Sequence, residues 1–362
     1  MIKKLLAAAC CLLMLLGCIS AMGETASLKE IYLGKFDFGA AAPQRAFSDP
    51  RLLTLMKNQF CILTPENELK PNYVVDWEKS KKLTEETGDE TAVAVHFTAA
   101  KPLLDFAKKN GVKVHGHVLV WHIETKEGFF HEGYDSKKPR LSREKMLGRL
   151  ENYIREIMLY LDENYPGVVV SWDVVNEAID DGTKGLRKSN WYDIVGEDYV
   201  ERAFELARRY APEGTLLYYN DYNTAYPGKL KGILALLEKL IEEGNIDGYG
   251  FQMHHRVLEP GMTMLTNAVK AVAALNLRLR VSELDVGIKT YSEESLEKQA
   301  KKYAAVMRLM LQYADQTEAV QVWGLTDSMS YRSYEYPLLF DAKCKPKPAF
   351  QAVADPENEA WQ

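Results

Sequence analysis

Short hydrophobic runs rich in β-branched and aromatic residues alternate along this chain with longer amphipathic stretches. The short runs have the length of buried strands, and the longer ones repeat their apolar residues with the period of a helix. This alternation is typical of βα units around a parallel sheet. Eight strands are predicted, at residues 34–40, 60–64, 112–120, 168–175, 216–220, 248–253, 279–284 and 319–324.

Helical patterns separate many of these strands, and Pro or Gly marks many of their ends. No linker, composition shift or internal repeat divides the chain, so we expect one (β/α)8 TIM barrel over residues 24–362. Its active site should lie at the C-terminal ends of the strands. Residues 77–94 are charged and poor in apolar side chains, which predicts a solvated insertion between strands two and three. The predicted helices are residues 99–109, 143–163, 192–209, 230–243, 265–274 and 294–313.

The first residues have the layout of an export signal. Lys3 and Lys4 precede an apolar run over residues 5–16, and small residues follow. The run is too short to span a bilayer, so no membrane span is expected. Two cleavage sites compete: after Gly23, which makes residues 1–23 an ordinary signal peptide, or before Cys18, which would then carry a lipid anchor. Either interpretation predicts a secreted or surface-anchored protein.

Composition narrows the function classes. Apolar residues make up 47% of the chain and charged residues 27%, as in ordinary globular proteins. The net charge of −6 comes without a basic block, so nucleic acid is not an expected partner. Outside the first segment only Cys61 and Cys344 remain, which excludes a disulfide framework and a thiolate zinc site. Cys61 is predicted to be a small core residue, its pairing with Cys344 stays open, and we expect a monomer.

Polar and aromatic side chains gather where seven of the predicted strands end, although barrel interiors should be apolar. His115 and His117 alternate on one strand, as metal ligands can, but no third ligand with suitable spacing is present. We therefore expect no metal site. The strand-end clusters begin at Thr64, His117, Trp172, Asn220, Gln252, Glu283 and Trp323.

Two of these strand-end residues, Glu177 and Glu283, end the fourth and seventh strands, which face each other across the mouth of an eight-stranded barrel. Opposed carboxyl groups are the machinery of glycoside hydrolysis. Asp285 lies two residues after Glu283, on the same side of the strand, and His254 could bond to both carboxylates. That arrangement would keep Glu283 ionised and oriented as a nucleophile.

Five motifs occur along the chain in this order: GHVLVWH, SWDVVNEAIDD, LYYNDYN, SELDV and VWGLTD. With these motifs the chain resembles glycoside hydrolase family 10, the retaining endo-β-1,4-xylanases. The resemblance implies hydrolysis of xylan and xylo-oligosaccharides without a cofactor, with Glu177 as acid/base and Glu283 as nucleophile. His254 and Asp285 would orient the nucleophile. Substrate-binding roles fall on Glu66, Asn67, Lys70, His117, Trp121, Asn176, Gln252, His254 and Trp323, to which we add Tyr222 and Tyr331.

The chain departs from this family at clustered positions. Ile123, Glu124 and neighbouring residues stand where the family usually has Ser-Gln-Thr-Pro, and Gly128 and Tyr331 stand where it often has Trp. We expect Glu124 to lie beside the bound sugars and to change affinity or subsite preference. Two alternatives stay open: a glycan-binding surface lipoprotein without turnover, and a related barrel that cleaves β-1,4-glucan.

Overall fold

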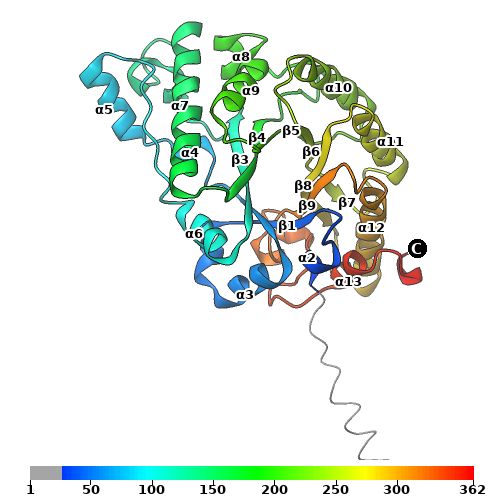
Figure 1. The fold of residues 1–362 in the computed structure, drawn as a ribbon. Helices are drawn as coiled ribbons and strands as arrows, with labels where there is room; N and C mark the ends of the chain where they lie inside the picture. Colours follow the sequence, from blue (N-terminus) through cyan, green and yellow to red (C-terminus); the bar gives the residue numbers. More distant parts are fainter. Residues whose placement is uncertain (1–26) are drawn as a thin grey trace, which may run out of the picture.

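Eight parallel strands close into a barrel with helices around it, as predicted (Figure 1). The computed structural model describes residues 27–362, so the expected signal sequence and Cys18 lie outside the described residues. The ring closes because β1 pairs with β9 and β6 pairs with β8. The barrel strands are β1 (Asp37–Ala42), β2 (Ile62–Pro65), β3 (Lys113–Trp121), β4 (Val169–Asn176), β5 (Leu216–Asp221), β6 (Gly248–Phe251), β8 (Arg278–Gly287) and β9 (Thr317–Val322).

A short ninth strand, β7 (His254–Arg256), was not predicted as a separate element. It follows β6 and pairs in parallel with the outer half of β8, with His254 opposite Asp285 in the register. The strand predicted over residues 248–253 therefore ends two residues earlier, and the chain re-enters the sheet at His254. Met253, at the break, has a φ of 58°, which turns the chain between the two strands.

The helices cover the outside of the barrel (Figure 1). The prediction of one helix over residues 192–209 was wrong, because Gly196 (φ 105°) separates α8 from α9. Residues 77–94 are not only a solvated insertion: they contain α5, capped by the side chain of Asp76 and ended by Gly88 in the left-handed region. The helices are α2 (Leu28–Ile31), α3 (Pro50–Gln59), α4 (Pro71–Val74), α5 (Trp77–Thr87), α6 (Lys101–Asn110), α7 (Arg143–Asn164), α8 (Asn190–Val195), α9 (Tyr199–Tyr210), α10 (Pro227–Glu242), α11 (Met262–Ala273), α12 (Glu293–Leu311) and α13 (Pro348–Ala354).

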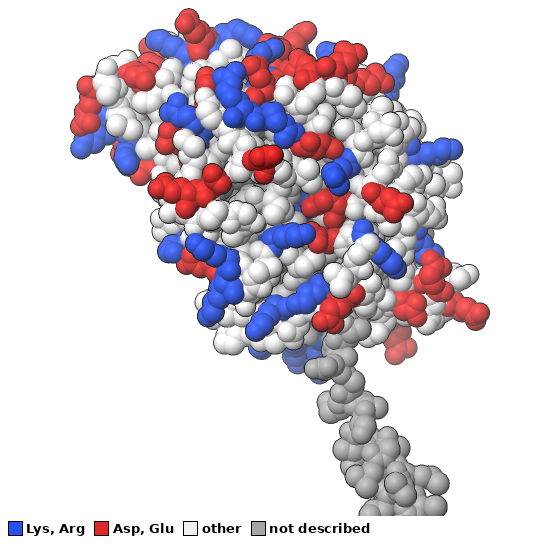
Figure 2. Space-filling view, viewed as in Figure 1, with Lys and Arg blue, Asp and Glu red and all other residues white. Residues whose placement is uncertain are grey.

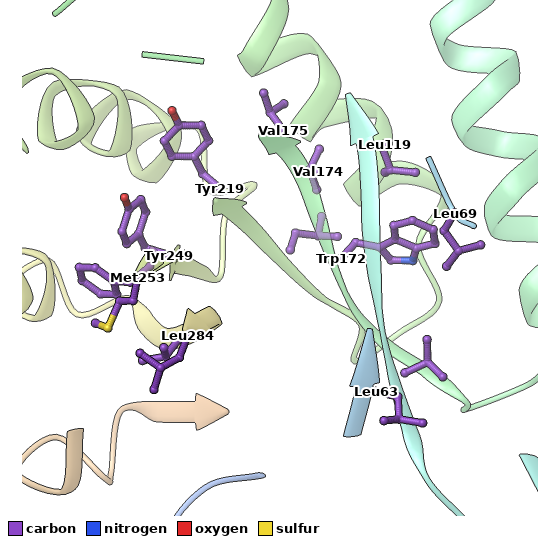
Figure 3. Packing of buried hydrophobic residues seen from close by; sticks show 14 of the residues in the cluster. Leu63, Leu69, Leu119, Trp172, Val174, Val175, Tyr219, Tyr249, Met253 and Leu284 are labelled. Carbon is purple, nitrogen blue, oxygen red and sulfur yellow. The ribbon is translucent and has the colours of Figure 1, made fainter. Parts of the chain in front are cut away.

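Close packing between strands depends on a few glycines. Trp172 of β4 is fully buried and projects over β3 (Figure 3). A Cβ atom at Gly116 of β3 would lie 2.3 Å from the Trp172 ring, so only glycine leaves room for this indole. The ring thus fills the space beside the strand that delivers His117 and Trp121 to the barrel mouth.

The barrel interior contains buried polar and charged side chains, whereas an apolar interior was expected from the sequence. Arg280 of β8 is fully buried and donates hydrogen bonds to Gln321 of β9, at 3.1 Å from its Nε and 2.6 Å from its Nη2. Further up the barrel, the carboxylate of Asp173 lies 3.1 Å from His115 and 2.8 Å from His117. Burial of polar groups is costly unless they are paired, and the hydrogen bonds of Arg280 and of His117 offset part of that cost. Polar side chains therefore extend from the base of the barrel toward its mouth.

Cys61 and Cys344 are both free thiols, so they form no disulfide. Cys61 is not the core residue that was predicted: it precedes β2, is only partly buried, and its Sγ lies 3.4 Å from Asp37 Oδ1. Burial and the neighbouring Asp37 carboxylate raise the pKa of the Cys61 thiol to about 12. Among residues 27–362, we find no helix with the length and apolar character needed to cross a bilayer.

Candidate active site

One cleft at the mouth of the barrel brings the predicted site residues together. Its volume is about 670 Å³. Asp285 does not line it and lies fully buried behind His254. The lining includes Glu66, Asn67, Lys70, His117, Trp121, Asn176, Glu177, Tyr222, Gln252, His254, Glu283, Trp323 and Tyr331.

Glu283 is held from both sides of its carboxylate. Asn220 of β5 donates a hydrogen bond of 2.8 Å to Oε1, and Nε2 of His254 lies 2.9 Å from Oε2. Although burial alone raises the pKa of Glu283, the hydrogen bond and the positive charge of His254 outweigh burial and lower it below its usual value. The carboxylate is therefore ionised and fixed in direction, which suits a nucleophile.

His254 bridges two carboxylates. Its Nδ1 lies 2.8 Å from Asp285 Oδ2, while its Nε2 faces Glu283. Burial lowers the pKa of His254, but the charges and hydrogen bonds of Asp285 and Glu283 raise it overall, to about 10. At neutral pH the ring is therefore an imidazolium that donates from both nitrogens.

Glu177 follows the last residue of β4 and has a φ of 57°, a conformation that non-glycine residues adopt rarely. Its backbone N–H donates to the carbonyl of Asn220 at 2.9 Å, which fixes the turn. Trp121 Nε1 donates to Oε2 at 3.0 Å, and Gln252 Nε2 donates to Oε1 at 3.0 Å. A strained backbone held by neighbours of this kind is common at functional sites.

His122 lies on the other side of Glu177, with its Nδ1 4.0 Å from Oε2. Burial, helped by the charges of Arg187 and Lys229, lowers the pKa of His122 to about 4. His254 and His122, which lie beside the two glutamates, therefore differ in charge: His254 is cationic beside Glu283, and His122 is neutral beside Glu177.

Lys70 marks the end of the cleft formed after β2. Its ammonium group donates to Asn67 Oδ1 at 2.8 Å and lies 5.0 Å from the centre of the Trp121 ring. Burial lowers the pKa of Lys70, and the carboxylates of Glu283 and Glu124 oppose that shift.

The expectation that Glu124 lies beside the substrate was wrong. Its carboxylate accepts a hydrogen bond of 2.8 Å from the side chain of Asn72, and it does not line the cleft. It does not pair with Lys126, whose ammonium group lies over the Trp77 ring. Glu124 has a φ of 57°, and its side chain is directed toward Asn72 of α4. Its charge acts on Lys70, which does line the cleft.

Aromatic rings form the walls of the cleft. The ring of His117 lies 5.3 Å from that of Trp323, and the ring of His254 lies 5.4 Å from that of Tyr331, both edge-on. Tyr331 is 56% exposed and lines the cleft, so a ligand can reach it. Aromatic faces beside hydrogen-bonding groups suit sugars, which present both C–H and O–H groups.

The described residues hold no group of three or more side chains suited to a metal ion. His115 and His117 both face Asp173, and Nδ1 of His115 bonds to the Ser171 hydroxyl at 2.8 Å. Nδ1 of each histidine is thus hydrogen-bonded within the barrel, to Ser171 and to Asp173 respectively. On the face seen in Figure 2, Lys and Arg are interspersed with Asp and Glu, without the continuous basic stripe expected for a nucleic-acid surface.

Comparison with known proteins decides the family. The profile of Glycosyl hydrolase family 10 matches residues 27–356, which is nearly all of the described chain. The chain belongs to glycosyl hydrolase family 10. The family and the (β/α)8 barrel predicted from the sequence are thus both confirmed.

Other members of family 10 are similar along most of this chain. Endo-1,4-beta-xylanase B of Butyrivibrio fibrisolvens is 38% identical over 337 residues, which are 90% of this chain and 52% of that protein. A beta-1,4-xylanase of Dictyoglomus thermophilum is 34% identical over 349 residues, covering 91% of each chain. The chain thus spans only about half the length of the Butyrivibrio relative, and it spans 34% of a bifunctional endo-1,4-beta-xylanase of Ruminococcus flavefaciens, at 33% identity.

Solved family 10 structures have the same fold. The N-terminal modules of endo-1,4-beta-D-xylanase 10B from Clostridium thermocellum, complexed with xylohexaose, give a TM-score of 0.84 at 30% identity, covering 92% of this chain and 68% of that one. An intracellular xylanase of Thermoanaerobacterium saccharolyticum, complexed with xylotriose, gives 0.82 at 30% identity, covering 91% and 99%.

Several residues of this family 10 site were missed from the sequence. Asn220 was noticed at a strand end but given no role, although its amide contacts the nucleophile candidate. Tyr226, Arg256 and Tyr334 also line the cleft. Arg256 is the last residue of β7 and Tyr226 follows β5 within a few residues, so their position at strand ends was the available signal. Tyr334 lies in the 3₁₀ helix Ser333–Glu335, well beyond β9, and no strand-end position marked it.

Proposed function

We propose that this chain is an endo-β-1,4-xylanase that cleaves internal bonds of xylan with retention of configuration. The single observation that carries the proposal is the contrast between two glutamates in one cleft. Glu283 is buried, ionised and aimed by His254 and Asn220, whereas Glu177 stands on a strained turn beside neutral donors. Retaining glycosidases need one carboxylate as nucleophile and a second carboxyl group as acid and then base.

The proposed reaction is a double displacement. Glu177 donates its proton to the glycosidic oxygen while the Glu283 carboxylate attacks C1, so the C1–O bond breaks and a glycosyl-enzyme ester forms. Glu177, now ionised, removes a proton from water, and the hydroxide oxygen displaces Glu283 from C1. The negative charge of Glu283 favours the protonated form of Glu177 before attack, and neutralisation of Glu283 in the ester removes that influence.

Substrate roles follow from position in the cleft. Lys70 and Asn67 would bind sugar hydroxyls on one side of the scissile bond, together with Glu66 and His117. Trp121, Trp323 and Tyr331 would stack against sugar rings, and Tyr222 would contact the sugar beyond Glu177. Asn176 would bond to the sugar 2-hydroxyl, and Gln252 would hold Glu177 in place.

Hydrolysis of xylan compared with carboxymethylcellulose tests the function. We expect reducing ends to appear from xylan and to be at least about tenfold slower to appear from carboxymethylcellulose, since an exocyclic hydroxymethyl group must fit a cleft built for a pentose. Faster release from carboxymethylcellulose would favour the glucan-cleaving alternative. Binding of xylan without any turnover would favour the glycan-binding lipoprotein.

We also infer that the chain is exported, with residues 1–23 as its signal and the remainder acting as a monomer. The charged and then apolar layout of residues 3–16, followed by small residues, supports an extracytoplasmic enzyme. N-terminal sequencing of the mature protein distinguishes cleavage after Gly23 from cleavage before Cys18, and incorporation of radiolabelled palmitate identifies the lipid anchor. Light scattering measures the oligomeric state.

A further inference from the structure

A row of alternating charges extends from Glu283 beyond His254 and Asp285. Nη1 of Arg332 donates to Asp285 Oδ1, and Nε of Arg332 donates to Glu335 Oε2 at 2.7 Å. The other oxygen of Glu335 accepts from Arg256, at 3.0 Å from Nε and 2.8 Å from Nη2. In order, the row consists of Glu283, His254, Asp285, Arg332, Glu335 and Arg256.

The backbone holds this row in place from three elements. Asp285 lies on β8 and His254 on β7, while Arg332 and Glu335 come from the segment after β9 that includes the 3₁₀ helix Ser333–Glu335. Ile288 N–H donates to the carbonyl of Glu335 at 2.8 Å, so this segment is fastened to the end of β8. Arg332 also donates to the carbonyl of His255 at 3.2 Å.

Space for the Arg332–Glu335 pair depends on one glycine. A Cβ atom at Gly287 would lie 2.6 Å from Glu335 Oε2 and 2.7 Å from Arg332 Nη2. The pair is therefore packed directly against the end of β8, two residues after Asp285. Arg332 and Glu335 are both buried, whereas the Arg256 side chain is 56% exposed.

We propose that Arg332 and Glu335 are positioning residues that set the charge balance at Glu283 through Asp285 and His254. This inference rests on the proposed function, because Glu283 matters as a nucleophile only there. Neither residue touches the reacting atoms in the proposed mechanism. Arg332 neutralises Asp285, so that His254 does not stand between two unopposed carboxylates, and Glu335 limits the excess positive charge that Arg332 would otherwise bring.

Because the charges alternate along the row, each substitution should shift the pKa of Glu283 in a defined direction. Loss of the positive charge in Arg332→Gln leaves Glu283 in a more negative surrounding and should raise its pKa. Loss of the negative charge in Glu335→Gln should lower it. Arg256→Gln should raise it only slightly, because solvent screens an exposed charge.

Other charged and titratable groups surround these residues and stay unchanged in the variants. Glu283 also faces His117 from β3, Asp173 from β4 and Lys70 from the segment after β2. Arg332 and Asp285 are also near the Tyr331 phenol, and Arg332 is near the His255 ring. Burial lowers the pKa of His255 well below its usual value, so that ring is neutral.

The test is the acidic limb of the kcat/KM profile against pH, measured with an aryl β-xylobioside. That limb reports the ionisation of the nucleophile in the free enzyme. We expect it to move up by about 0.5–1 pH unit in Arg332→Gln and down by a similar amount in Glu335→Gln. Arg332→Lys keeps the charge, so its limb should stay near that of the unmodified enzyme even if its KM or melting temperature changes.

The matched controls are Arg143→Gln and Asp198→Asn, which break a double-hydrogen-bonded ion pair outside the cleft. Their acidic limbs should not move. The proposal would be overturned if the acidic limb stayed fixed in Arg332→Gln and Glu335→Gln, or if it moved in the same direction in both. Arg332 and Glu335 would then have a merely structural role. If Arg332→Gln does not fold, Glu335→Gln and Arg256→Gln still differ in predicted sign.

The same experiment distinguishes failure of the proposed function from failure of the positioning role. An unmodified enzyme that cleaves no aryl xylobioside would reject the function, whereas an active enzyme without opposite shifts rejects the positioning role alone. If the enzyme is inactive, a ¹³C NMR titration of labelled glutamate carboxyls measures the pKa of Glu283 without turnover. The pKa shifts in the variants should have the same signs as those expected for the acidic limb. The Glu283 signal is assigned by its loss in Glu283→Gln.

Discussion

Asn220 donates a hydrogen bond of 2.8 Å to Oε1 of Glu283. The same amide group lies 3.1 Å from Asn176 Oδ1, and the Asn176 amide nitrogen lies 3.3 Å from Glu177 Oε1. Two asparagines thus connect the two glutamates of the cleft through hydrogen bonds. Side chains of β4 and β5 therefore help to hold the spacing of the two carboxyl groups.

The two glutamates should respond differently to removal. Glu283→Ala should abolish turnover of every substrate, because no nucleophile remains. Glu177→Ala should retain activity on aryl xylobiosides with good leaving groups, which need little protonation, and lose at least about 100-fold on poor ones. The measurement is kcat/KM across a leaving-group series, taken for the glycosylation step. Equal losses for good and poor leaving groups would remove Glu177 from the acid role.

Cleavage should retain the anomeric configuration. A retaining site needs carboxyl groups about 5–5.5 Å apart, against about 6.5–9.5 Å where a water attacks directly. Proton NMR of the first products from xylo-oligosaccharides should show the β-anomer before mutarotation. Early appearance of the α-anomer contradicts the double displacement.

Glu124→Gln should act through Lys70. Burial lowers the pKa of Lys70, and Glu124 is one of the carboxylates that keep it from falling further. Removal of that charge lowers the Lys70 pKa again, so Lys70 should lose its proton at a lower pH. We expect KM for xylo-oligosaccharides to begin its alkaline rise about 0.3–0.5 unit earlier than in the unmodified enzyme. Glu78→Gln on α5 is the control, and identical KM profiles for both variants would exclude the coupling.

The His254 imidazolium should stabilise the folded state in a defined pH window. Its pKa rises from 6.5 to about 10 on folding, so its contribution is complete below about pH 6.5 and is lost as the pH rises through 10. Denaturant unfolding at pH 6 and pH 10 measures it. The free energy of unfolding should fall by about 2–4 kcal/mol more in the unmodified protein than in His254→Gln.

His96→Gln replaces a partly buried histidine that does not line the cleft, and it serves as the control for this titration. Other groups titrate in the unmodified protein and in both variants. The contribution of His254 is therefore the difference between these proteins in how the free energy of unfolding changes with pH. Equal pH dependence in His254→Gln and the unmodified protein would mean that His254 is not charged in the folded state.

The barrel and the cleft could be predicted because strands of a barrel deliver their last residues to one mouth. Glu177 and Glu283 were recognised from that position alone, before any resemblance was considered. Arg332 and Glu335 could not be found in this way, because their partners come from β7 and β8 and only the folded chain brings them together. Glu124 was misplaced because its positive φ turns the side chain away, and sequence patterns do not report φ at a single residue.

The break between β6 and β7 separates the placement of His254 from the course of the loop that follows β7. His254 is set opposite Asp285 by backbone pairing, whereas the segment from Val257 to Gly261 leaves the sheet beyond Arg256. A protein engineer could therefore exchange that segment for one from another family 10 enzyme without moving the imidazolium. The part of the cleft that β7 holds in place and the part that this loop forms can therefore change separately during evolution.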